Sequence, residues 1–198
     1  MRFVAAVLCA GLALPVFSEV SKSTATKTLG SAVAPIRIEI FSDFQCPACK
    51  SLHETTLKQL IDEYVNGKKK VFLIHREFPL PMHAYARTAA CYACAAERIG
   101  KYEQVGDALF RNQETWAKDG NVDKILASVL STGEVERVRA LIKDPGVVAE
   151  VNNDMQLGHT KQIHSTPTMI IRYKDQEYPV SNVSYPLLKR FLDELLTK

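Results

Sequence analysis

The chain has 198 residues, 46% of them hydrophobic and 24% charged, with a formal net charge of +3 at pH 7. This length and hydrophobic content suit one globular domain, or one domain with a large insertion. The small net charge gives no reason to expect nucleic acid as a partner.

The N-terminus has the pattern of an export signal. Arg2 precedes an apolar run over residues 3–14 that is too short to span a bilayer. Val16 and Ser18 supply the β-branched and small side chains expected just before a cleavage site. Residues 1–18 are therefore predicted to be a secretory signal peptide, cleaved after Ser18, that sends the protein to the periplasm. A lipoprotein signal centred on Cys9 and an uncleaved anchor are the alternatives.

Residues 19–35 are rich in Ser, Thr, Lys and Ala and show no apolar period. This composition predicts a flexible or loosely docked lead-in. Because the segment is too short to be a dimerisation domain, we expect the protein to be a monomer.

Two cysteines follow, at the junction of a predicted strand and a predicted helix. Residues 36–41 are a β-branched run typical of a strand, and residues 57–64 place apolar side chains at helical spacing. Free amides and the dipole at a helix N-terminus stabilise an anion, so Cys46 is expected to hold a thiolate readily. Pro47 suits the first helical turn, and Ala48 completes the Cys-Pro-Ala-Cys motif. Cys46 is the candidate nucleophile, and Cys49, one turn inward, is the candidate resolving thiol.

The spacing of this motif also fits other chemistry. A Cys-x-x-Cys pair is half of a zinc site, and Cys91 with Cys94 offers two more ligands. An inert structural disulfide is a further alternative. In an exported chain, however, disulfides persist, and a large domain does not need a short-loop staple for stability. The pair is therefore interpreted as a redox centre, without a metal.

The remaining elements complete a mixed α/β pattern. Residues 71–74 are a continuous apolar run typical of a strand buried on both faces, which gives a βαβ unit with a right-handed crossover. From about residue 83 to residue 162 the chain has helical patterning throughout. Residues 168–173 and 177–180 then predict a β-hairpin, and residues 186–196 a last helix.

The order of elements and several motifs resemble the DsbA family of exported thiol–disulfide oxidoreductases. The matching residues are Phe41-Ser42-Asp43-Phe44-Gln45-Cys46-Pro47-Ala48-Cys49, Arg76-Glu77-Phe78-Pro79-Leu80, Cys94-Ala95-Ala96-Glu97 and Ser165-Thr166-Pro167-Thr168. The resemblance implies an α/β thioredoxin fold (βαβ … ββα) built from residues 36–80 and 165–198, with an all-helical domain, residues 81–164, inserted between the two halves. It also implies that Pro167 is cis and faces the Cys-Pro-Ala-Cys turn. Thr166 would then offer its backbone to a substrate strand.

Glu39 is a carboxylate in an otherwise apolar predicted strand. The resemblance favours burial beneath the cysteines, where an acid of raised pKa could relay protons and tune the pKa of the thiols. A salt bridge with a nearby lysine or arginine is the alternative.

Two features depart from the family pattern. Ala48 stands where the best-known oxidants carry His, so one donor near the Cys46 thiolate is missing and a milder oxidant is expected. Cys91 and Cys94 lie three residues apart on a predicted helix, where a disulfide is geometrically awkward. They are interpreted as small buried apolar residues, with a second redox pair or a metal pair as alternatives.

These observations predict an exported, monomeric dithiol oxidase. Its only redox group would be the Cys46–Cys49 disulfide, and its substrates would be reduced or unfolded exported proteins. By resemblance, a membrane redox partner would re-oxidise it. A reductase or isomerase of the same fold, a metal-binding protein, and a peptide-binding chaperone with an idle cysteine pair are the alternatives.

Overall fold

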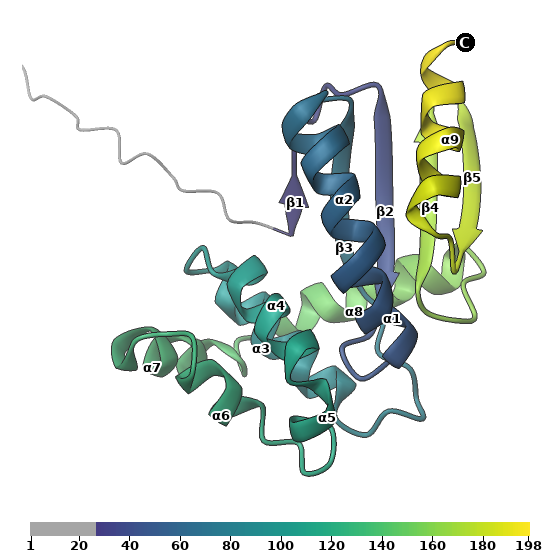
Figure 1. Cartoon of the computed structure of the whole chain (residues 1–198). Helices are drawn as coiled ribbons and strands as arrows, with labels where there is room; N and C mark the ends of the chain where they lie inside the picture. The colour runs from purple at the N-terminus through teal and green to yellow at the C-terminus, as the bar shows by residue number, and fades with distance from the viewer. Residues whose placement is uncertain (1–26) are drawn as a thin grey trace, which may run out of the picture.

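The computed structural model describes residues 27–198, so the predicted signal peptide and residues 19–26 of the lead-in lie outside the described part. A five-stranded sheet in the order β1-β3-β2-β4-β5 forms the centre of the fold. Strands β2 and β3 are parallel, and the other neighbouring pairs are antiparallel (Figure 1). The strands are β1 (Thr28–Leu29), β2 (Ile36–Ser42), β3 (Val71–Glu77), β4 (Thr168–Tyr173) and β5 (Gln176–Ser181).

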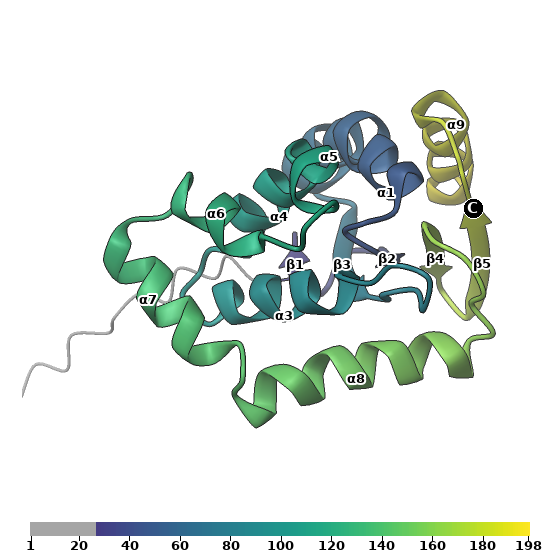
Figure 2. The same ribbon diagram turned by 90° about the horizontal axis from the view of Figure 1, so that it is seen from below.

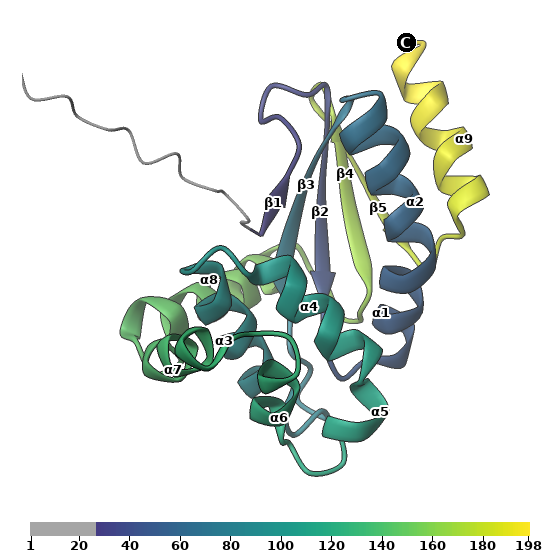
Figure 3. The same ribbon diagram turned by 60° about the vertical axis from the view of Figure 1, so that its left-hand side comes forward.

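Helices from both ends of the chain cover one face of the sheet. The first is a continuous helical stretch made of α1 (Pro47–Leu52), η1 (His53–Leu57), α2 (Lys58–Leu60) and η2 (Ile61–Gly67), in which η1 and η2 have π-helical turns. The second is α9 (Tyr185–Leu196), which packs beside it over the same face (Figure 3). Alternate β2 side chains such as Ile38 and Ile40 point into this layer and meet Leu60 and Leu192 in one buried apolar cluster. The apolar side chains at every second position of the strand and those along one side of the helices therefore bury each other.

The segment between β3 and β4 is helical. It comprises α3 (Ala86–Glu97), α4 (Tyr102–Arg111), α5 (Gln113–Trp116), α6 (Val122–Ala127), α7 (Thr132–Leu141) and α8 (Pro145–Thr160). Trp116 is buried within this group, and its indole N–H donates to the Leu109 carbonyl at 2.7 Å. The long α8 runs back along the other face of the sheet (Figure 2). There Leu157 packs beside the buried side chains of Phe41 and Ile170.

The predicted order of βαβ, helical insert and ββα is confirmed. In the part that the structure describes, residues 27–35, the lead-in differs from the flexible or loosely docked segment that was predicted. Thr28 and Leu29 add an antiparallel edge strand to β3, and Lys27 is 5% exposed. The reason is electrostatic, because the Lys27 ammonium makes ion pairs with Glu150 and Asp154 of α8. Within residues 27–198 no helix is long and apolar enough to cross a membrane.

Candidate active site

The Cys-Pro-Ala-Cys motif forms the turn from β2 into α1. Cys46 is the N-cap of α1 with extended backbone angles (φ −76°, ψ 120°), and Pro47 is the first helical residue. The Cys46 carbonyl accepts the Lys50 N–H at 3.1 Å, which closes the first helical turn. The sulfur of Cys46 therefore lies at the helix end where backbone amides have no helical acceptor. This is the position that the sequence predicted.

The two thiols have opposite acidity. The pKa of Cys46 is lowered to about 5 by a hydrogen bond with the Cys49 thiol, by Thr166 and by the amides of Cys49 and Ala48, which together outweigh burial. The pKa of Cys49 is raised far above its ordinary value, first by burial and then by its hydrogen bond with Cys46. Cys46 is 6% exposed and Cys49 is 1% exposed. The structure thus pairs one thiolate at neutral pH, exposed over a small part of its surface, with one almost fully buried, protonated thiol.

The loop before β4 faces this turn. The Thr166–Pro167 peptide bond is cis, as the resemblance implied. The Thr166 carbonyl lies 3.4 Å from the Cys46 sulfur and accepts its hydrogen bond. The fold therefore brings together the cysteine at the start of α1 and a residue of the loop before β4, which are 120 positions apart in the chain.

Asp43 and Gln45 hold the turn in place, and the sequence analysis assigned neither a role. Asp43 Oδ1 accepts the Gln45 N–H at 2.7 Å, and its Oδ2 accepts the Leu80 N–H at 2.7 Å. Gln45 Oε1 in turn accepts the Tyr85 N–H at 2.5 Å. Both side chains thus tie the turn to the segment that leads from β3 into α3. Two polar residues inside an otherwise apolar motif are a signal that could have pointed to this role.

A third anchor comes from the helical insert. The buried side-chain amide of Gln113 donates to the Phe44 carbonyl at 2.7 Å and to the Cys46 carbonyl at 3.1 Å. No local pattern marks Gln113, because its partners lie 67 and 69 residues away in the chain. The insert therefore helps to shape the backbone around Cys46.

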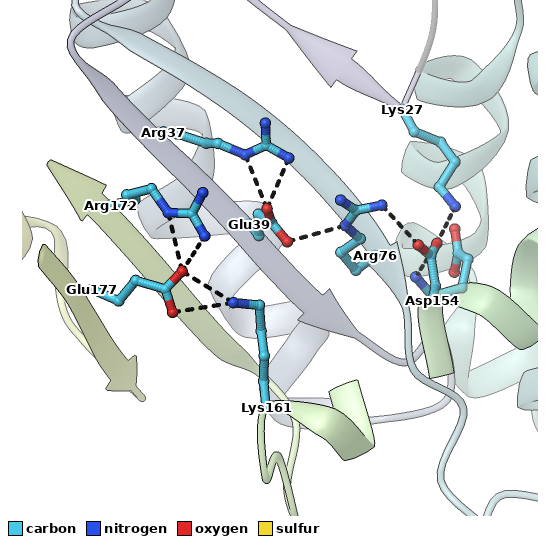
Figure 4. Close-up of polar contacts among 9 residues, drawn as sticks. Lys27, Arg37, Glu39, Arg76, Asp154, Lys161, Arg172 and Glu177 are labelled. Atoms are coloured by element: carbon cyan, nitrogen blue, oxygen red, sulfur yellow. Dashed lines mark hydrogen bonds and ion pairs between the residues drawn. The ribbon is translucent and has the colours of Figure 1, made fainter. Parts of the chain in front are cut away.

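Glu39 is buried, as the resemblance suggested, but both of its oxygens are engaged by arginines. Arg37 Nη2 lies 2.9 Å from Oε1, and Arg76 Nε lies 3.2 Å from Oε2. Arg76 continues to Asp154 at 3.0 Å, and Asp154 pairs with Lys27 (Figure 4). This arrangement favours the salt-bridge interpretation of Glu39 over the proton relay.

The same charged network attaches α8 to the sheet. Asp154 is on α8, and it also accepts the N–H of Glu77 at the end of β3 at 3.1 Å. Near the other end of α8, Lys161 and Arg172 both pair with Glu177 of β5 (Figure 4). Since buried charges are costly without partners, the pairs of the buried Asp154 fix which surface of α8 meets the sheet. The exposed pairs of Glu177 add little to this.

Cys91 and Cys94 lie within α3, away from the helix ends. Cys94 is fully buried and Cys91 is partly buried. Burial raises the pKa of both thiols, and the nearby Glu77 raises it further. Within residues 27–198 no group of three or more His, Cys, Asp and Glu side chains could hold a metal ion. The burial of Cys94 and the partial burial of Cys91 inside α3 favour the interpretation of these cysteines as small buried side chains.

A groove begins beside the active-site turn. Its volume is about 420 Å³, and it runs from Ala48 between the first helical stretch and the segment leading into α9. Leu52 and Thr56 form one wall, and Val183 and Tyr185 form the other. No charged side chain lines it. An extended peptide that reached Cys46 could continue into this groove.

Comparisons with known proteins agree with this geometry. The family model described as thioredoxin matches residues 22–194. A Bacillus cereus protein named "probable disulfide bond formation protein D" is 24% identical over 181 residues, which cover 87% of this chain and 79% of that protein. The crystal structure of Wolbachia pipientis alpha-DsbA1 superposes with a TM-score of 0.72 at 23% identity, covering 85% of this chain and 89% of the other. Oxidised BdbD from Bacillus subtilis superposes with a TM-score of 0.68 at 19% identity, covering 88% of this chain and 94% of the other.

Proposed function

Since this chain belongs to the thioredoxin family and is a DsbA-like protein disulfide oxidoreductase, we propose that it acts as a dithiol oxidase for exported proteins. The observation that carries the proposal is the opposite acidity of the two thiols. A Cys46 thiolate that is stabilised in the reduced protein makes the Cys46–Cys49 disulfide easier to reduce, and hence more oxidising.

The proposed reaction transfers one disulfide. A substrate thiolate attacks the Cys46 sulfur of the Cys46–Cys49 disulfide, and Cys49 departs and takes up a proton. A mixed disulfide between Cys46 and the substrate results. A second substrate thiolate then attacks the substrate sulfur of that bond, and Cys46 leaves as a thiolate. The substrate loses two electrons and the cysteine pair gains them, so the low pKa of Cys46 favours the last step.

Backbone pairing supports the substrate assignment. The Thr166 carbonyl lies beside the Cys46 sulfur, and an extended chain placed there could pair with the Thr166 backbone as an added strand. The uncharged groove that starts at Ala48 would receive the rest of the segment. Main-chain recognition of this kind suits reduced or unfolded proteins of varied sequence. A membrane redox partner that re-oxidises the pair, a monomeric state and a periplasmic location remain part of this proposal.

The reduction potential of the Cys46–Cys49 pair tests the direction of the reaction. The Cys46 pKa of about 5 lies between those of thioredoxin, about 7, and DsbA, about 3.5. Equilibration of the protein with glutathione should therefore give an intermediate potential of roughly −200 mV. A value near about −270 mV would make the protein a reductant and would overturn the oxidase proposal.

A further inference from the structure

Asp43 has an unusually complete set of partners for a residue next to the redox pair. Its side chain is 0% exposed. Three donors converge on its two oxygens: the Gln45 N–H on Oδ1, and the Leu80 N–H and the His83 ring nitrogen Nδ1 on Oδ2, each at 2.7 Å. The orientation of Asp43 is thus determined from both sides of the carboxylate.

The backbone of Asp43 reaches both cysteines. Its N–H lies 3.5 Å from the Cys49 sulfur and donates to it. Its carbonyl accepts the Cys46 N–H at 3.1 Å. Any rotation of Asp43 would therefore move the donor on the buried sulfur and the acceptor at the helix start together.

Of these three donors to Asp43, His83 is the one that donates from a side chain, and the other two are backbone amides. It lies in the segment between β3 and α3, and its side chain is 22% exposed. From these contacts we propose that His83 is a positioning residue for the resolving step. Through Asp43, it holds the backbone amide that donates to the Cys49 sulfur.

The chemistry of that step explains why an amide donor matters. Cys49 loses its proton and attacks the Cys46 sulfur of a mixed disulfide. The Cys46–Cys49 bond forms as the bond from Cys46 to the other sulfur breaks, and that other sulfur leaves as a thiolate that takes up a proton. Cys49 must carry negative charge as it attacks, and burial opposes that charge. A correctly placed N–H stabilises the charge directly. The inference rests on the proposed roles of Cys46 and Cys49.

The test uses glutathione disulfide to oxidise the cysteine pair of the reduced protein and measures the two steps of this oxidation separately. Reduced full-length protein is mixed with glutathione disulfide, quenched in acid at set times and analysed by mass. The first step adds glutathione to Cys46, and the second, attack by Cys49, releases it. His83→Ala should leave the first rate unchanged and slow the second by about tenfold, the effect of losing one well-placed hydrogen bond.

Two further variants make the result specific. His83→Asn places an amide N–H near the position of Nδ1 and should restore the second rate to within about twofold of the original. His53 also pairs with an aspartate across the two halves of the molecule, with Nε2 2.5 Å from Asp107 Oδ1, but within residues 27–198 that aspartate makes no hydrogen bond to a cysteine sulfur. His53→Ala is therefore the matched control and should leave both rates unchanged.

Several outcomes would overturn the proposal. A second step of unchanged rate in His83→Ala would do so, as would equal slowing by His53→Ala, or no rescue by His83→Asn. If the unsubstituted protein forms no adduct at Cys46, the assignment of the nucleophile fails instead, and that result is distinct from a failure of the second step.

Discussion

Two Cys-x-x-Cys pairs in this molecule have the same spacing and opposite surroundings. Cys46 precedes the first turn of α1 with an extended backbone, where the helix amides are free to face its sulfur. Cys91 and Cys94 lie inside α3, which runs from Ala86 to Glu97, so their amides and those around them already donate to helix carbonyls. Position along a helix, more than spacing, therefore decides which sulfur can hold negative charge.

Nearby charges do not reverse this difference. The Lys27 ammonium lies 3.7 Å from the Cys94 sulfur, which by itself would favour a thiolate. The pKa of Cys94 is nevertheless raised, because burial and the charge of Glu77 outweigh Lys27. At Cys46 the hydrogen-bond donors face the sulfur directly, and the pKa falls to about 5. Directed hydrogen bonds thus affect these thiols more than one cation shared among several carboxylates.

The largest expected difference in oxidation rate is between variants that lack a cysteine of the first pair and variants that lack a cysteine of the second pair. Cys46→Ser should lower the rate at which the protein oxidises a reduced model substrate by at least about 10³-fold, because the nucleophile is lost. Cys91→Ala and Cys94→Ala should retain the rate of the unsubstituted protein. If Cys46→Ser kept its oxidation rate, Cys46 would not be the nucleophile of this reaction. If Cys94→Ala lost oxidation but not stability, the second pair would have a redox role.

A change beside Cys94 should affect stability instead of chemistry. Lys27→Met removes the buried ammonium that pairs with Asp154 and Glu150 and leaves Arg76 as the remaining cationic partner of the buried Asp154. Urea unfolding should show a loss of about 3 kcal/mol, the usual cost of breaking a buried ion pair. The reduction potential of Cys46–Cys49 should stay the same in this variant. A shifted potential with unchanged stability would contradict the purely structural interpretation of the Lys27 network.

Local patterns were sufficient to predict the elements that surround Cys46. The alternating apolar residues of β2 and the helical stripe that follows are readable within about 30 residues, and they place the motif at a strand-to-helix junction. The cis bond before Pro167 came from resemblance, because an isolated Thr-Pro pair does not specify its isomer. The predictions that held therefore depend on short-range periodicity or on a recognised motif.

The contacts that position the turn could not be predicted in this way. β1 has two residues and no period, and its neighbour Lys27 is buried because of carboxylates on α8 that are more than 120 positions away. Gln113 meets the backbone around Cys46 only when the insert folds against the sheet. Glu39 was expected as a relay, with a salt bridge as the alternative, and Arg76, 37 positions away in the chain, joins the nearby Arg37 in binding its oxygens. Each depends on partners that only the tertiary fold brings together.

The pH dependence of alkylation should separate the two pairs most directly. With a pKa of about 5, Cys46 in the reduced protein is a thiolate throughout the neutral range, so its rate with iodoacetamide should be nearly flat from pH 8 to 6 and fall only below about 5. The pKa of Cys91 is raised by burial, so its rate should fall about tenfold for each unit from pH 8 downward. Between pH 8 and pH 6 the ratio of the Cys46 rate to the Cys91 rate should therefore rise by about a hundredfold, measured by mass after limited alkylation.

The same shift links the redox state to stability. The pKa of Cys46 is lower in the folded protein than in the unfolded chain, so the thiolate stabilises the reduced protein fully above the unfolded pKa of about 8.5. That contribution should decline as pH falls and disappear below about 5, while the oxidised protein, which has no thiolate, should not show it. Urea unfolding of both forms between pH 8 and 4 measures the difference. If the difference in unfolding free energy between the reduced and oxidised forms did not change with pH, Cys46 would lack the lowered pKa. The chemical contrast with Cys91 and Cys94 would then be lost.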